Sequence, residues 1–310
     1  MIKNLCIILL VELIFIFSSC EKEISPHFMD GDRKIVLNSI INPDSLISVY
    51  LSESIFPDES FFSPSLNTGG YKTIEGAKVE LYDNDSLLGL LQYIGAGKYI
   101  SGFKPKTNQD YSLKVTADKF PQAKAKTNLP IKIPIDSVRL ISENENENVF
   151  YKLNIRLFFN DLPDVKNYYY LVVLYNNTKF NTFNFWGKRI FKSNDPVFLK
   201  HIDQKQYYIF DDELFDGEEY GLSLQLTTNI YDGLSSDTIH YHFYLCSINY
   251  DLYNYLKSYN KVVLTTDSDH NPIPLSEPVN FYNNIENGFG IFGGYQIDIV
   301  TLEYVKSSAN

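Results

Sequence analysis

Apolar and polar residues alternate with a period of two along much of this chain. Ala77 to Tyr82 follows this pattern, and Tyr111, Leu113 and Val115 repeat it. Such alternation is typical of β-strands with one buried face. The chain also contains 24 Tyr and 22 Phe, residue types that favour strands. The sequence therefore predicts a mostly β protein.

Turn signals divide the β-rich region into two predicted domains. Seven or so short strands in residues 34–133 predict an immunoglobulin-like or transthyretin-like β-sandwich. Pro130 and Pro134 cannot join a central strand, so we place the domain boundary there. Residues 134–310 are predicted to form a second β-rich domain. Its strongly polar segment 143–148 is expected to be a solvated hairpin tip.

One short helix is predicted within the second domain. Its apolar face is formed by Leu252, Tyr255, Leu256, Tyr259 and Val263, which recur with helical spacing. We expect this helix to cap an open end of the second sandwich. The last predicted strand runs from Tyr295 to Val305.

The first twenty residues resemble a bacterial lipoprotein signal. Lys3 precedes an apolar run, interrupted only by Glu12, that is shorter than the ~20 residues of a membrane-spanning helix. Small residues then lead to Cys20. We predict a signal peptide at 1–19, a lipid on Cys20 and a tether at 20–33. An uncleaved anchor helix and an ordinary secretory peptide are the alternatives.

Charge and cysteine content exclude some functions. The formal net charge is −11, which argues against nucleic acid as a partner. If Cys20 carries lipid, the mature chain keeps only Cys246 and has no intramolecular disulfide. We expect Cys246 to be a buried small hydrophobe rather than a nucleophile.

A glycine motif at residues 288–293 matches the dinucleotide pattern G-x-G-x-x-G. Its context does not fit, because a strand rather than a helix is predicted after it. We expect these glycines to let the backbone turn tightly while Phe289 and Phe292 fill a core.

Three groups of residues resemble metal ligands, but each has a simpler interpretation. His240 and His242 share one strand face without an evident third ligand. Residues 267–271 have part of a calcium-loop spacing but lack its glycine and its final glutamate. The third group is an acidic cluster that we interpret as a solvated loop, composed of Asp211, Asp212, Glu213, Asp216, Glu218 and Glu219. We therefore predict no metal and no cofactor.

No catalytic motif stands out, so we predict a protein that is not an enzyme. A hydrolase with an unrecognised carboxylate pair is the less favoured alternative. An aromatic stretch at residues 180–186 is more suggestive, because Phe183, Phe185 and Trp186 alternate with polar residues. These rings, with Phe180, could contact a partner or ligand, or could equally face a core.

Six blocks of the chain, taken in order, resemble the Bacteroidota lipoproteins grouped as domain of unknown function 4249. These blocks are SCEKEI (19–24), KIVLN (34–38), EGAKV (75–79), GKY (97–99) with YSLKV (111–115), FDDELFDG (210–217) and NIENGFGIFGG (284–294). The resemblance covers nearly the whole mature chain. The family has no established catalytic residues to transfer.

The resemblance implies an outer-membrane lipoprotein that serves as a binding or accessory subunit beside a TonB-dependent receptor. The charged residues Glu21, Lys22 and Glu23 are similar to a surface-export signal, which favours the cell surface over the periplasmic face. A surface adhesin or glycan-binding module is the alternative.

Overall fold

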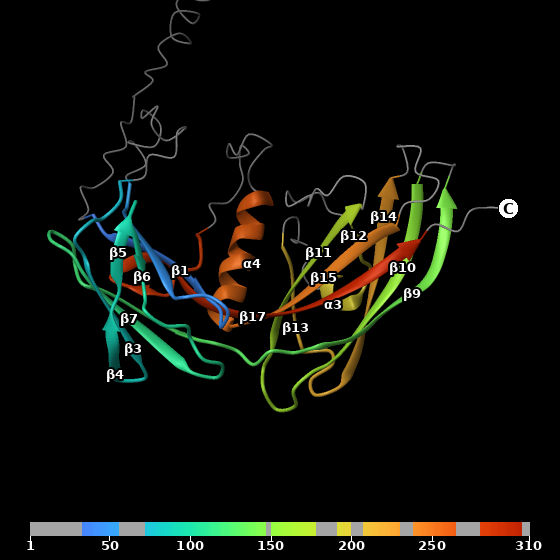
Figure 1. Cartoon of the computed structure of the whole chain (residues 1–310), viewed down its shortest axis with the longest axis horizontal. Coiled ribbons are helices and arrows are strands. Elements are labelled where there is room, and N and C mark those ends of the chain that lie inside the picture. Colours follow the sequence, from blue (N-terminus) through green and yellow to red (C-terminus); the bar gives the residue numbers. More distant parts are fainter. Residues whose placement is uncertain are drawn as a thin grey trace, which may run out of the picture.

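The computed structural model describes residues 33–55, 72–146, 150–177, 191–199, 207–229, 238–264 and 280–305. These residues form two β-sandwich lobes, with a helix standing between them (Figure 1). The predicted mostly β fold class is confirmed.

The first lobe packs one end of an eight-stranded sheet against a five-stranded sheet. Its core contains Leu37, Val49 and Leu51 from the first sheet and Leu81 and Leu113 from the second. The strands from the eight-stranded sheet are β1 (Ile35–Ile41), β2 (Ser48–Glu53), β6 (Lys98–Ile100) and β5 (Gln92–Gly95). The five-stranded sheet contains β16 (Ile285–Glu286), β8 (Ala123–Asn128), β7 (Asp110–Thr116), β3 (Lys78–Asp83) and β4 (Ser86–Leu90).

The second lobe packs the other end of the eight-stranded sheet against a four-stranded sheet. Its core is rich in aromatic rings, and Phe159, Tyr169, Phe210 and Phe243 are almost completely buried there. The eight-stranded sheet contributes β13 (Tyr208–Asp211), β11 (Tyr168–Asn177), β15 (Thr238–Ile248) and β17 (Gly288–Val305). The opposing sheet is β12 (Phe191–Lys192), β14 (Glu219–Asn229), β10 (Phe150–Asn160) and β9 (Ile135–Asn146).

Strand β17 belongs to both lobes. Gly288 to Gly294 pair in parallel with β1, and Tyr295 to Val305 pair antiparallel with β15. The connection from β8 to β9 contains the predicted boundary at 133, but the chain returns to the first lobe through β16 and the start of β17. The division of the chain into separately folding domains at 34–133 and 134–310 stays a prediction.

The glycine motif lies inside β17, so its predicted tight turn is wrong. Gly290 has a φ of +116°, and a Cβ added there would overlap the Leu37 carbonyl of the neighbouring strand. Glycine is required because the two backbones approach closely. Phe292 is buried in the first core as expected, but Phe289 is 47% exposed beneath the ammonium of Lys34.

The polar segment after residue 142 is also more regular than predicted. Strand β9 continues to Asn146, and Glu143 and Asn144 pair with Leu153 and Lys152 of β10. Glu143 also accepts a hydrogen bond from the Tyr304 hydroxyl. Hydrogen bonding between β9 and β10 thus holds residues 143–146 in a strand despite their polar side chains.

The predicted helix is confirmed as α4 (Tyr250–Leu264), and α3 (Pro196–Leu199) is a single additional turn. The expected capping role of α4 is wrong. Its residues Leu252, Tyr253 and Leu256 pack on Ile209 and Ile248, which lie on the sheet face opposite the aromatic core. The second lobe therefore has three layers, with α4 outermost on the side facing the first lobe (Figure 1).

Asn249 connects this helix to both lobes. Its Oδ1 accepts hydrogen bonds from the Leu252 and Gly294 amides, so it caps α4 and holds β17. Its Nδ2 donates to Thr127 Oγ1 at 2.8 Å and to the Asn128 carbonyl in β8. One side chain thus joins the helix, the shared strand and the five-stranded sheet.

We expect Gly290→Ala to lower the free energy of unfolding by at least about 2 kcal/mol, because a side chain both strains the backbone and separates β17 from β1. Urea denaturation would measure this. Gly102→Ala is the matched control, since a Cβ there meets nothing within 4 Å. Equal stability of the two variants would contradict the assigned pairing.

We expect Asn249→Ala to cost about 2 kcal/mol, through loss of the helix cap and of the hydrogen bonds to β8. Asn249→Asp retains the capping oxygen but turns a buried carboxylate oxygen toward the Asn128 carbonyl, so its loss should be at least as large. Thermal and urea unfolding would compare the two. Wild-type stability in Asn249→Ala would show that the lobes are joined without this side chain.

Candidate functional site

The predicted acidic cluster lies in the turn between β13 and β14, and part of it is buried. Asp212 is only 1% exposed, whereas Glu213, Asp216 and Glu218 are exposed. Asp161, which follows β10, is 5% exposed and lies close to this turn. The interpretation as a solvated loop therefore holds for the exposed carboxylates but not for Asp212.

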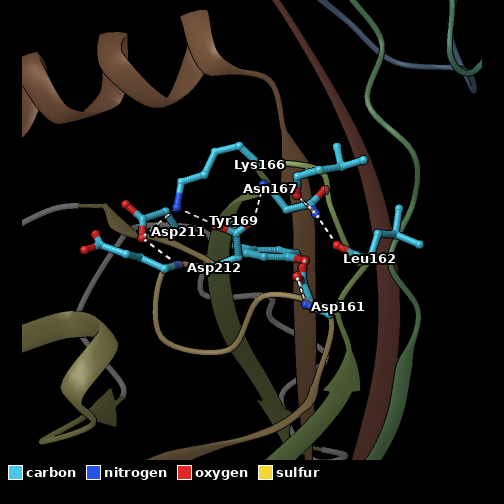
Figure 2. Close-up of polar contacts among 10 residues, drawn as sticks. Asp161, Leu162, Lys166, Asn167, Tyr169, Asp211 and Asp212 are labelled. Carbon is cyan, nitrogen blue, oxygen red and sulfur yellow. Dashed lines mark hydrogen bonds and ion pairs between the residues drawn. The ribbon is translucent and has the colours of Figure 1, made fainter.

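Asp212 is held by donors from the segment before β11. Lys166 Nζ donates to Oδ1 and the Asn167 backbone amide donates to Oδ2, both at 2.5 Å (Figure 2). The Lys166 ammonium also lies 3.6 Å from Asp211 Oδ1. Burial alone would lower the pKa of Lys166, but the hydrogen bond to Asp212 and the neighbouring carboxylates raise it overall. Lys166 thus stays charged and offsets part of the negative charge of Asp211 and Asp212.

Asp161 is held by a different pair of donors. The Tyr169 hydroxyl donates to Oδ1, and the Gly217 backbone amide donates to Oδ2 at 3.0 Å. Gly217 has a φ of +72°, and a Cβ there would press on Pro163. Burial raises the pKa of Asp161 above its usual range, although its two hydrogen bonds oppose this shift. Burial and the bond to Asp161 also raise the pKa of Tyr169.

A cation is one chemical possibility for this network. One carboxylate oxygen from each of Asp161, Asp212 and Asp216 lies within 4.8 Å of the others, and oxygens are the ligands that Ca²⁺ prefers. However, all four oxygens of Asp161 and Asp212 already accept hydrogen bonds from the protein. The arrangement therefore favours a structural role, in which these hydrogen bonds join three segments of the chain, over a metal centre.

Only one half of this network is evident from the sequence. The acidic turn is predicted, but Asp161, Lys166 and Tyr169, which lie about 50 residues earlier, are not. The available signal was Asp161 directly after a predicted strand and before Pro163, followed by a lysine and a run of tyrosines.

The other predicted residues are placed as follows. His242 Nδ1 lies 2.8 Å from Thr301 Oγ1 of β17, and burial together with the charge of His240 lowers the pKa of His242. Cys246 is 6% exposed and burial raises its pKa to about 12, which confirms the buried hydrophobe. Several candidates lie outside the described residues: Cys20, Glu21, Lys22, Glu23, Phe180, Phe183, Phe185, Trp186 and residues 267–271.

Neither helix of the described ranges has the length and hydropathy that a bilayer-crossing segment requires.

The fold and the network define a class: a mostly β protein of two sandwiches that share one strand, with buried carboxylates that join three segments of the second sandwich. The chain belongs to the family described as a domain of unknown function, DUF4249, whose model matches residues 21–299. No curated protein matches the chain. The predicted family of unknown function is thus confirmed.

We expect Asp161→Leu to cost about 2 kcal/mol, because the Tyr169 hydroxyl and the Gly217 amide lose their acceptor in a buried site. Asp161→Asn should cost less, since an amide can accept from Gly217 and donate to the tyrosine oxygen. Urea denaturation would measure both. Equal losses would show that packing, rather than hydrogen bonding, is what Asp161 supplies.

The raised pKa of Asp161 also predicts a pH dependence. The folded state favours the protonated acid, so the contribution of Asp161 to stability is greatest below its unfolded-state pKa of about 3.9. It is lost as pH rises through the folded-state pKa. As pH rises above about 4, the wild type should therefore lose more stability than Asp161→Asn. Parallel pH curves of the two proteins would contradict this.

Proposed function

We propose that this protein is a lipid-anchored outer-membrane protein that serves as a non-enzymatic accessory or binding subunit of a TonB-dependent transport system. One observation carries the proposal: the family match begins at residue 21, directly after the cysteine that ends a signal-like apolar segment. A lipid on Cys20 would place that matched body beside a membrane. Each buried acyl CH₂ contributes about 0.8 kcal/mol, so several chains hold firmly.

The two buried acids of the second lobe fit the non-enzymatic part of this proposal. The buried acids Asp161 and Asp212 are the natural candidates for acid–base chemistry, but protein donors occupy their oxygens. They contribute to the fold of the second lobe and leave no free group aimed at a substrate.

The membrane face forms part of the proposal. Glu21, Lys22 and Glu23 would follow the lipid directly, and their similarity to an export signal favours the cell surface. Protease treatment of intact cells would test this. Replacing the three residues by alanine should protect the protein from the protease, while membrane association stays unchanged.

We expect Cys20→Ser to move the protein from the membrane fraction to the soluble fraction, because the lipid is its attachment. Fractionation with acyl labelling would measure this. Cys246→Ser is the matched control: Cys246 is buried in the second lobe, so this variant should keep both the label and the membrane location.

Affinity isolation from outer membrane solubilised in mild detergent would test the partner. We expect the wild-type protein to recover a barrel receptor, and Cys20→Ser to recover little of it. Wild-type protein recovered repeatedly without any barrel protein would remove the transport role while leaving the lipid anchor intact.

A further inference from the structure

A polar groove crosses the outer face of the four-stranded sheet, on the side of the second lobe opposite α4. Its volume is about 440 Å³. Leu153, Ile155 and Leu157 of β10 face the core, so the alternate residues Asn154 and Arg156 point outward. The remaining polar lining comes from β14 and from β12 with the residues after it: Ser223, Gln225, Lys192, Ser193 and Asn194.

This groove is positively charged within an acidic part of the chain. Residues 134–310 contain 13 Lys or Arg and 23 Asp or Glu. None of the residues that line the groove is acidic, whereas Arg156 and Lys192 are both lining and exposed. Chance placement of charge in this region would favour carboxylates.

The pairing of β9 with β10 is a second, independent observation that favours an anionic ligand in this groove. Arg139 of β9 is paired directly opposite Arg156 of β10. Like charges in such cross-strand pairs are destabilising. Among the described residues neither arginine forms an ion pair, although the Arg139 guanidinium stacks 4.8 Å from the Phe158 ring centroid. The fold therefore tolerates a repulsion that a bound anion would relieve.

The other lining groups define the rest of the ligand. Gln225 Nε2 donates to Asn154 Oδ1 at 3.1 Å, and Asn154 Nδ2 donates to Ser142 Oγ at 2.8 Å. These two hydrogen bonds orient the Asn154 and Gln225 amides across the floor of the groove, where they can exchange hydrogen bonds with hydroxyl groups of a ligand. The only apolar side chain exposed at the rim is Ile141. A strongly apolar ligand would find little surface here.

We propose that this groove binds an acidic saccharide, with its carboxylate or sulfate on Arg156 and Lys192 and its hydroxyls on Asn154 and Gln225. Arginine forms paired hydrogen bonds with such planar or tetrahedral anions. The volume suits a short segment of a chain rather than a large molecule. The inference goes beyond the proposed function and does not require the lipid anchor or a receptor.

Calorimetry on the purified full-length protein in detergent would test it. The probes are a galacturonate hexasaccharide, a sulfated hexasaccharide, the neutral maltohexaose and inorganic phosphate. We expect one or both acidic saccharides to bind, with affinity falling as salt rises, and the neutral one to bind at least tenfold more weakly. The two acidic probes distinguish carboxylate from sulfate.

Arg156→Gln should weaken binding about tenfold or more and Lys192→Gln should weaken it several-fold. The matched control is Lys114→Gln, a partly exposed lysine on the outer face of the first lobe. Arg156→Gln should also raise the melting temperature of the free protein, because it removes the repulsion with Arg139.

Several outcomes would overturn the proposal: no binding of either acidic saccharide, equal binding of the neutral one, or equal weakening by Lys114→Gln and Arg156→Gln. Full displacement of the saccharide by an equal concentration of phosphate would overturn the saccharide assignment. Because no receptor is present, none of these results depends on the transport role.

Discussion

The pairing of β17 with β1 and β15 is the interaction on which the rest of the structure depends. A single 18-residue strand supplies Phe292 to the first core and Tyr304 to the second. A slip of one residue in its register would turn both side chains away from their cores. Where the strand passes between the lobes, the Gly294 amide donates a hydrogen bond to Asn249 Oδ1. Asn249 also caps α4 and donates to Thr127 of β8, so the helix, the shared strand and the five-stranded sheet meet at this residue.

The local pattern of the sequence predicted most strands and the helix, but not the way in which the lobes share a strand. Alternation and helical spacing are short-range signals. Alternation correctly predicted β7, and helical spacing correctly predicted α4. The start of β17 escaped because Gly288 and Gly290 are poor strand formers by propensity. They are tolerated because Leu37 of β1 approaches there, and β1 lies about 250 residues earlier in the chain.

The short range of these sequence signals also explains why only part of the candidate site could be predicted. The acidic turn is visible in the sequence as a solvated loop, and its exposed members fit that interpretation. Burial of Asp161 and Asp212 follows from tertiary contacts, since a buried carboxylate is stable only when donors satisfy it. Those donors are Tyr169, Lys166, and the backbone amides of Asn167 and Gly217. No local rule joins Asp161 to a turn that begins 50 residues later.

The basic groove shows most clearly why register matters to function. In the sequence, Arg139 and Arg156 occupy the solvent-facing positions of two alternating strands, where charged residues are ordinary. They become informative only when the sheet places one opposite the other and adds Lys192 from β12 beside Gln225. Three cations of an acidic chain, Arg139, Arg156 and Lys192, thus share one sheet face, and the opposed arginines lower its stability. A binding role for that face explains the arrangement, whereas solubility alone would be served by carboxylates at the same positions.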